Sequence, residues 1–444
     1  MKKILFFTAT LFFLHAALCQ QTAKLEELMD VYTRQYKFNG SVLVVHKGKI
    51  ILDKGYGLRN AADSSRNDQN SIFQIGSITK QFTATVLLKL QEEKKLSLKN
   101  KLSQYFPGYP KGDSITLEHL LTHTSGIYSY TDDQSFMTNE VAKPASREKM
   151  MALFKNKPLL FSPGSQWSYS NSAYSLLGYI IEDVTKMPYE QVVRNYIFKK
   201  AGMGHSGFAF TLLTNPDKAT GYFRLKEDGN TPAPVVDSSV SYSAGSIYST
   251  TGDLYNWFLA MQRNSIISLA SKTIAYTPVL NKYGYGWVTD SIAGQKTIGH
   301  SGGIFGFTSN MVSVPGDSTT VILLANIGTP HLFTITNSIY AILYNQPYEL
   351  PRERTAIVLP AEILEQYTGV FELLPELVIK VSVEDGKLIA KPEGQEALQL
   401  HPEKTDLFFL KEIDAQIKFT RNEKNEVIAM TLYQGGKEMT GKKR

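Results

Sequence analysis

The stretch FQIGSITKQFTA, from Phe73 to Ala84, places a serine directly after a glycine and a lysine three residues after that serine. Serine is a common helix N-cap residue, so the pattern predicts the start of a helix. Residues three apart share one face of a helix, which would make Ser77 and Lys80 neighbours. Because unpaired N–H groups at a helix N-terminus favour negative charge, Ser77 is also a candidate nucleophile with Lys80 as its base.

A lysine amine is a base near neutral pH only where burial or a nearby cation lowers its pKa. The apolar residues Phe82, Val86 and Leu90 continue the helical pattern and offer such burial. The Ser-x-x-Lys spacing is not decisive by itself, because Ser146 and Lys149 repeat it in a charged stretch. Ser146 is predicted to cap a surface helix.

A second candidate group is Tyr169-Ser170-Asn171, within FSPGSQWSYSN. A tyrosine with a lowered pKa, placed near Ser77, could take the serine proton and return it to the leaving group. Asn171 could donate hydrogen bonds to a substrate amide and accept them from it. The alternative is a turn that leads into an amphipathic helix, and both interpretations can hold together.

A third candidate group is His300-Ser301-Gly302-Gly303, within TIGHSGGIFGFTSN. Glycine in a strand lets another backbone or a ligand approach closely. The N–H groups of Gly303 and Ser77 could therefore form an oxyanion hole. His205-Ser206-Gly207 and His46-Lys47-Gly48 repeat parts of the pattern, but His46 lies in a plain hairpin turn, and His205 lies in a loop without the second glycine and the following pair of strands.

Strand-rich segments near residues 40–60 and 295–327 flank a long helical middle. This order predicts an α+β fold in which one mixed sheet is completed from both ends of the chain. Residues 346–360 contain three prolines and predict a linker, and 361–444 alternate apolar and polar residues as a small all-β domain does.

The first 19 residues have the order of a secretory signal peptide, with two lysines before an apolar run from Ile4 to Leu18. That run is shorter than the roughly 20 residues that span a bilayer, and no other segment is long and apolar enough. The mature protein is therefore expected in the periplasm or secreted, without a transmembrane segment. Cys19 lies at the expected cleavage point, and a lipid anchor on Cys19 is the alternative.

The composition limits the classes of protein to which the chain can belong. The 444 residues are 43% hydrophobic and 20% charged, enough for two domains with a sizeable core. The formal charge of +6 is not clustered, which argues against nucleic-acid binding. His119 and His123 are four apart, but no glutamate follows His119, so packing or capping is expected there rather than zinc binding.

The three groups, in this order, resemble the motifs of the serine β-lactamase and penicillin-binding protein superfamily. The closest branch is the class C β-lactamase group with its esterase and D-peptidase relatives. The resemblance covers residues 24–345, and residues 361–444 resemble the small β-domain often appended to such hydrolases. It implies an α/β sandwich with a central antiparallel sheet flanked by helices, followed by a barrel-like domain.

The resemblance also implies roles. Ser77 would attack an acyl carbonyl while Lys80 and Tyr169 manage the protons, and water would release the acyl group from an ester intermediate. The substrate would be a small ester or peptide, with no metal or cofactor. The remaining site residues would line the pocket or hold the oxyanion: Asn171, His300, Gly302 and Gly303.

One departure from the family pattern bears on the substrate. Class C β-lactamases carry Lys-Thr-Gly where this chain has His300-Ser301-Gly302, and histidine is mostly neutral near pH 7. A neutral ester or small amide is therefore favoured over a carboxylate-bearing β-lactam. A true β-lactamase and a non-catalytic binder of cell-wall ligands remain the alternatives, and the oligomeric state is open.

Overall fold

The computed structural model describes residues 20–351, 354–374, 377–395, 397–410, 415–434 and 437–444. The predicted signal peptide, with Cys19, lies outside these residues. Contacts within the chain divide it into two units, one ending at Leu350 and one spanning Pro351–Arg444. Each unit is described by itself. None of the helices in the described part of the chain combines the length and apolar character needed to cross a bilayer.

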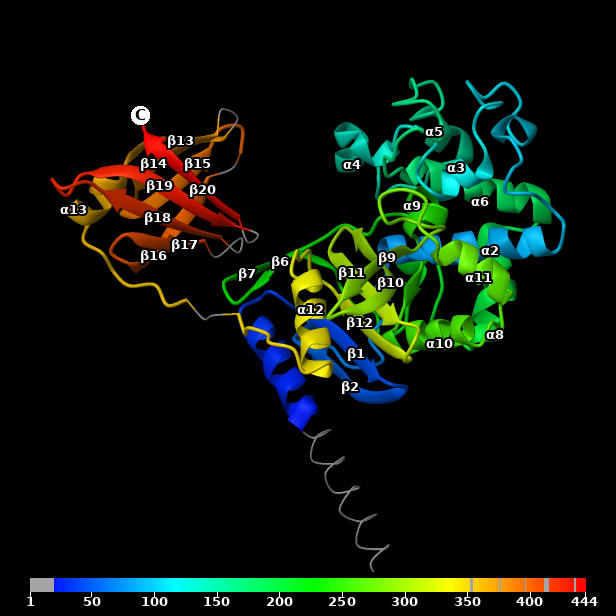
Figure 1. The fold of residues 1–444 in the computed structure, drawn as a ribbon, viewed down its shortest axis with the longest axis horizontal. Helices are drawn as coiled ribbons and strands as arrows, with labels where there is room; N and C mark the ends of the chain where they lie inside the picture. The colour runs from blue at the N-terminus through cyan, green and yellow to red at the C-terminus, as the bar shows by residue number, and fades with distance from the viewer. Residues whose placement is uncertain (1–19, 352–353, 375–376, 396, 411–414, 435–436) are drawn as a thin grey trace, which may run out of the picture. The chain divides into compact units, whose positions relative to one another are not determined.

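The first unit is built on a six-stranded sheet (Figure 1). Every pair of neighbouring strands in it is antiparallel, so the mixed sheet expected from the strand pattern is wrong, and the antiparallel sheet implied by the family resemblance is confirmed. Both ends of the unit contribute strands, as predicted. In spatial order the strands are β2 (Lys49–Tyr56), β1 (Gly40–His46), β12 (Thr319–Ala325), β11 (Phe307–Val314), β10 (Gln295–Ile304) and β9 (Val288–Ile292).

Short turns explain the strand directions. Lys47 and Gly48 join β1 to β2 with positive φ angles of 50° and 76°, the backbone of a tight hairpin turn. Such two-residue connections reverse the chain and make neighbouring strands antiparallel. The pairing of β1 with β12, from Gly40 opposite Ala325 onward, has no local turn and depends on packing.

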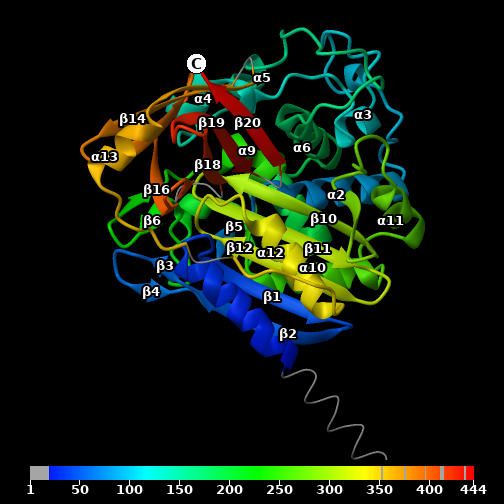
Figure 2. The same ribbon diagram turned by 60° about the vertical axis from the view of Figure 1, so that its left-hand side comes forward.

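Helices cover both faces of this sheet, which is why β1 and β12 are buried along nearly their whole length. Alternate side chains of a strand point to opposite faces. Leu43 and Ile322 pack in the core that contains α2 (Thr79–Glu92), whereas Val42 and Val321 pack with α12 (Leu332–Leu343) and the helix over 20–34. Figure 2 shows α12 and this N-terminal helix on the same side of the sheet.

A long helical segment lies between β2 and β9, as predicted. Its helices are η1 (Gly76–Ile78), α2, η2 (Leu102–Gln104), α3 (Leu117–Leu121), η3 (Tyr130–Asp132), α4 (Gln134–Asn139), α5 (Arg147–Ala152), α6 (Asn171–Thr185), α7 (Tyr189–Val193), η4 (Arg194–Phe198), α8 (Lys199–Ala201), η5 (Phe210–Leu212), α9 (Ser238–Gly245), α10 (Thr251–Gln262) and α11 (Leu269–Tyr276). Short strand pairs interrupt it: β3 (Leu58–Asn60) with β4 (Ser65–Arg66), β5 (Phe73–Gln74) with β8 (Tyr248–Ser249), and β6 (Tyr222–Lys226) with β7 (Gly229–Pro232).

The second unit begins with α13 (Ala361–Leu364) and η6 (Glu365–Tyr367) and continues as a closed eight-stranded barrel, so the barrel-like domain is confirmed. Asp385 and Gly386 form the hairpin turn between its second and third strands. Aromatic side chains such as Tyr367 and Phe371 fill its own core. The strands are β13 (Gly369–Leu374), β14 (Leu377–Glu384), β15 (Lys387–Pro392), β16 (Leu398–Lys404), β17 (Leu407–Phe409), β18 (Ala415–Arg421), β19 (Val427–Gln434) and β20 (Lys437–Lys443).

Candidate active site

Ser77 lies in η1, directly before α2, and its side chain is partly exposed. The hydroxyl makes no capping hydrogen bond to the helix, so the N-cap interpretation is wrong for this serine. Ser146 provides the contrast, because its Oγ accepts the Lys149 N–H at 3.2 Å at the start of α5. The same Ser-x-x-Lys spacing therefore occurs with a serine that caps a helix, Ser146, and with a serine whose hydroxyl does not, Ser77.

The Lys80 side chain is fully buried, and its Nζ has three oxygen neighbours. They are Ser77 Oγ at 3.0 Å, Asn171 Oδ1 at 2.7 Å and the Ala244 carbonyl oxygen at 2.8 Å. Burial lowers the pKa of Lys80 well below its ordinary value, because removal from water disfavours the charged form.

These contacts define how a neutral Lys80 amine is oriented. A neutral amine has two N–H groups and one lone pair. The carbonyl oxygens of Asn171 and Ala244 can only accept, so they take the two N–H groups. The lone pair then faces Ser77 Oγ, the geometry in which Lys80 removes the serine proton.

The Tyr169 ring lies over the buried amine, with its centroid 4.7 Å from Lys80 Nζ, and the Ser77 side chain is close enough to act on the pKa of the Tyr169 hydroxyl. The expectation of a lowered tyrosine pKa is wrong. Burial raises the pKa of Tyr169, and the opposing effect of the nearby Ser77 side chain is smaller. Tyr169 is therefore a neutral phenol near pH 7, suited to pass a proton on, and Lys80 is the better base.

Asn171 begins α6, directly after Ser170, whose Oγ caps the helix by accepting the Ala173 N–H. Both ends of the Asn171 amide are engaged. Oδ1 accepts from Lys80, and Nδ2 donates to Thr131 Oγ1 at 3.1 Å. The amide thus orients Lys80, and its contact with a substrate stays a prediction.

Strand β10 passes directly against η1. Gly76 has a φ of +52°, and a Cβ on it would lie 2.9 Å from the Gly303 nitrogen. A Cβ on Gly302 would lie only 2.0 Å from the Ile75 carbonyl oxygen. Glycine at these positions permits the approach that puts the Gly303 backbone beside Ser77, where the oxyanion hole is predicted.

His300 is buried, and both of its ring nitrogens are engaged. Nδ1 lies 2.6 Å from the Ser301 carbonyl oxygen, which can only accept, so Nδ1 carries the proton. Nε2 then accepts from the Tyr283 hydroxyl at 2.8 Å. Burial lowers the pKa of His300 to about 3, against a smaller raising effect of the Ser301 carbonyl. His300 is therefore uncharged at neutral pH.

The other histidines considered in the sequence make contacts outside this cluster. His205 is 65% exposed and lies 3.7 Å from Asp253, and His46 Nδ1 lies 3.2 Å from Thr319 Oγ1. His119 accepts the Thr116 N–H in a capping box, as expected of a capping residue. Across the described residues, no group of three or more metal-binding side chains occurs.

Sequence reasoning missed two residues that line this site. Tyr283 donates to His300, and His123 packs its ring 4.2 Å from that of Tyr169. His123 was expected only to pack or cap in its loop. The one available signal was its place in LLTHTSGI, a stretch typical of the family that the chain resembles.

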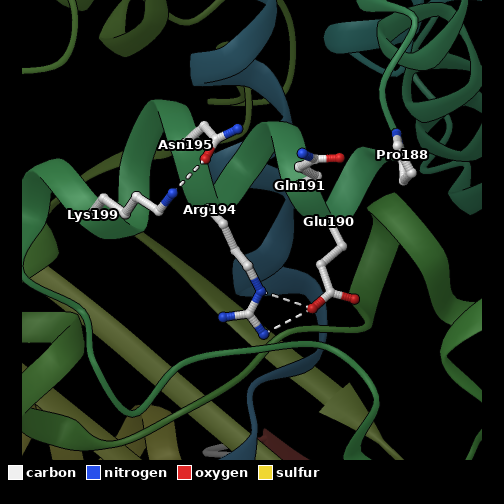
Figure 3. Close-up of a pocket in the computed structure, with 6 residues that line it drawn as sticks. All are labelled: Pro188, Glu190, Gln191, Arg194, Asn195 and Lys199. Atoms are coloured by element: carbon white, nitrogen blue, oxygen red, sulfur yellow. Dashed lines mark hydrogen bonds and ion pairs between the residues drawn. The ribbon is translucent and has the colours of Figure 1, made fainter.

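A separate shallow groove of about 370 Å³ lies on the surface of α7, η4 and α8 (Figure 3). Four of its polar side chains pair with one another, because Arg194 pairs with Glu190 and Lys199 donates to Asn195. None of its lining residues is a predicted site residue.

Comparison with known proteins matches each unit to a family. The family profile described as Beta-lactamase matches residues 23–346, and that of a domain of unknown function, DUF3471, matches 353–443. A penicillin-binding protein of Bacillus subtilis (strain 168) is 29% identical over 440 residues, covering 93% of this chain and 97% of its own.

Solved structures agree with these matches. The octameric penicillin-binding protein homologue from Pyrococcus abyssi is 25% identical, with a TM-score of 0.68, over 94% of this chain and 99% of its own. The penicillin-binding protein from Bacillus halodurans is 27% identical, with a TM-score of 0.64, over 71% of this chain and 98% of its own.

Proposed function

The chain belongs to the Beta-lactamase family, and on that premise we propose that it is an exported serine hydrolase that forms an acyl-enzyme on Ser77. One observation carries the proposal. The buried Lys80 Nζ lies 2.7 Å from Asn171 Oδ1, 2.8 Å from the Ala244 carbonyl oxygen and 3.0 Å from Ser77 Oγ, so a neutral amine that donates to the two carbonyl oxygens turns its lone pair to Ser77.

The proposed reaction has two steps. Lys80 takes the Ser77 proton as Oγ attacks the acyl carbonyl, and the N–H groups of Ser77 and Gly303 stabilise the oxyanion. The proton must then reach the leaving group, and Tyr169, a neutral phenol beside Lys80 whose pKa is affected by Ser77, is the group assigned to pass it on. Water attacks the acyl-enzyme in the second step, which releases the acid and restores Ser77.

The uncharged His300 supports neutral esters and amides, including D-peptides, as the substrate class. With both ring nitrogens engaged, His300 offers neither a cation nor a free donor to a carboxylate. The relatives are named for penicillin binding, so a penicillin is a necessary competitor in the test. Ester or amide turnover is expected to exceed β-lactam turnover.

The nucleophile is tested by labelling with a fluorescent fluorophosphonate. The wild-type protein should be labelled, and Ser77→Ala should not. Ser146→Ala is the matched control, since Ser146 has the same spacing to a lysine but caps a helix, and it should label like the wild type. Labelling that survives in Ser77→Ala would reject the mechanism.

The substrate class is tested by mass spectrometry of the intact protein after exposure to an ester, a D-alanyl-D-alanine peptide and a β-lactam. The retained acyl mass identifies the class. Faster turnover of the β-lactam would make the protein a β-lactamase. Binding of cell-wall fragments without acylation of any compound would favour the non-catalytic binder.

A further inference from the structure

His123, a residue to which no role is assigned above, holds the segment that carries Tyr169. The segment is bound on both sides of the tyrosine. The Ser168 N–H donates to the His123 carbonyl oxygen at 3.0 Å, and the Ser170 N–H donates to His123 Nδ1 at 3.1 Å. Between these two bonds, the imidazole lies against the Tyr169 ring at 4.2 Å between centroids.

We propose that His123 is a positioning residue that acts through Tyr169, keeping the phenol in hydrogen-bonding reach of Ser77. The inference rests on the proposed function, since it assigns Tyr169 a proton-transfer role. Three contacts, two polar and one between rings, hold the three consecutive residues 168–170 against one residue of the loop after α3. A shift of about 1 Å in a catalytic group can cost roughly 100-fold in rate, so such fixing matters for turnover.

The state of the His123 ring suits this role. Nδ1 accepts the Ser170 N–H, so the proton of the neutral ring is on Nε2. Burial lowers the pKa of His123 well below its ordinary value, because removal from water disfavours the charged ring. The acceptor is therefore retained at neutral pH. Nε2 lies among aromatic rings and has no hydrogen-bond partner among the described residues, so the ring's polar contact is to the tyrosine segment.

The backbone of His123 is left-handed. Its φ is +60°, a conformation that is uncommon among non-glycine residues, although histidine adopts it more often than most. Because the residue is completely buried, the surrounding packing holds this conformation. The left-handed turn allows one residue to present both its carbonyl oxygen and its ring to the same segment.

The experiment is a double-mutant cycle between His123 and Tyr169, measured as kcat and KM on an ester substrate. His123→Phe keeps an aromatic ring but removes the acceptor, and kcat should fall about 10- to 100-fold with little change in KM. In the Tyr169→Phe background, the same change should add less than about 3-fold, because the residue that it positions has lost its hydroxyl.

Two further variants control for folding. His123→Asn tolerates the left-handed backbone but lacks the ring, and it should also lower kcat. His119→Phe removes a comparable ring acceptor of a backbone N–H four residues earlier, and it should leave kcat unchanged. Independent effects of His123 and Tyr169 in the cycle, or equal kcat values in His123→Phe and His119→Phe, would overturn the proposal.

A readout independent of activity separates this proposal from the proposed function. In protein labelled with 13C at tyrosine Cζ, the Tyr169 signal is the one lost in Tyr169→Phe. His123→Phe should shift or broaden that signal, whereas His119→Phe should not. If the Tyr169 signal moves in His123→Phe, the positioning role is supported. If the wild type also neither hydrolyses nor covalently binds any compound, the hydrolase proposal fails independently. A signal that does not move in His123→Phe overturns the positioning.

Discussion

Lys80 Nζ and Asn171 Oδ1 lie 2.7 Å apart, and this contact joins two segments that are distant in the sequence. A neutral amide oxygen orients the amine without adding a negative charge beside it. A carboxylate at the same place would favour the charged ammonium and raise the pKa of Lys80. Asn171 therefore helps to keep the lysine available as a base.

Asn171→Asp should move the pH dependence of kcat/KM toward higher pH. The added carboxylate stabilises protonated Lys80, so activity at neutral pH should fall and recover as the pH is raised. The measurement is a pH–rate profile on an uncharged ester. Asn195→Asp on the surface of η4 is the control and should leave the profile in place. If the activity of Asn171→Asp rises with pH over the same range as that of the wild type, Asn171 does not influence the pKa of Lys80.

Lys80→Met should change how stability depends on pH. The pKa of Lys80 is lowered in the folded state relative to the ordinary value of 10.5, so between these two values the unfolded chain binds more protons. Wild-type stability should therefore gain from rising pH in that window, and the variant lacks this gain. The stability of Lys80→Met relative to the wild type should fall from about pH 7 to about pH 9.5.

This effect is measured by urea unfolding at the two pH values. Lys94→Met, at an exposed lysine just after α2, serves as the control for the loss of any lysine. The difference between Lys80→Met and the wild type should depend on pH more strongly than the difference for Lys94→Met. Equal dependence in the two variants would show that Lys80 is not held with a lowered pKa.

Gly302→Ala and Gly303→Ala should differ sharply although they are adjacent. The new Cβ at 302 would meet the Ile75 carbonyl oxygen, so β10 and η1 must separate, at a cost of about 1–3 kcal/mol in unfolding free energy. A Cβ at 303 meets nothing within 4 Å, so the change should stay within about 0.5 kcal/mol. Denaturant unfolding of both variants checks this, and similar losses in the two would contradict the described approach of β10 to η1.

The barrel unit should fold by itself. It has its own aromatic core and closes its strands without residues from the first unit. A fragment over 354–444 should show strand-type circular dichroism and one cooperative thermal transition. Phe371→Ala, in the centre of that core, should lower its unfolding free energy by about 3–5 kcal/mol. A fragment that unfolds without cooperativity would refute its independence.

The sequence predicted the parts of the site that depend on local spacing or on motif order. Ser77 and Lys80 are three residues apart, so a helical turn is enough to bring them together. Tyr169 and Asn171 joined them through the resemblance to a known family. The strand-rich ends predicted a sheet completed from both termini, but periodicity does not encode the direction of a strand whose partner is distant.

What the sequence could not provide depends on tertiary contacts. The role of His123 requires a left-handed backbone and a ring placed against a segment more than 40 residues away. The direction of the Tyr169 pKa shift depends on how many groups bury the phenol, which no motif states. The lowered pKa of His300 likewise depends on how deeply the fold buries its ring, which the sequence does not state.

The pairing of Gly40 with Ala325 has a consequence for biosynthesis. During translation, β1 leaves the ribosome long before β12 exists, so the run from Val42 to Val45 must wait with one edge unmatched. In a chain whose synthesis stops before Thr319, the unpaired edge of β1 would stay free to pair with strands of other nascent chains. Chains truncated before β12 should therefore aggregate or be degraded. In the full-length chain, β12 pairs with β1 and covers this edge.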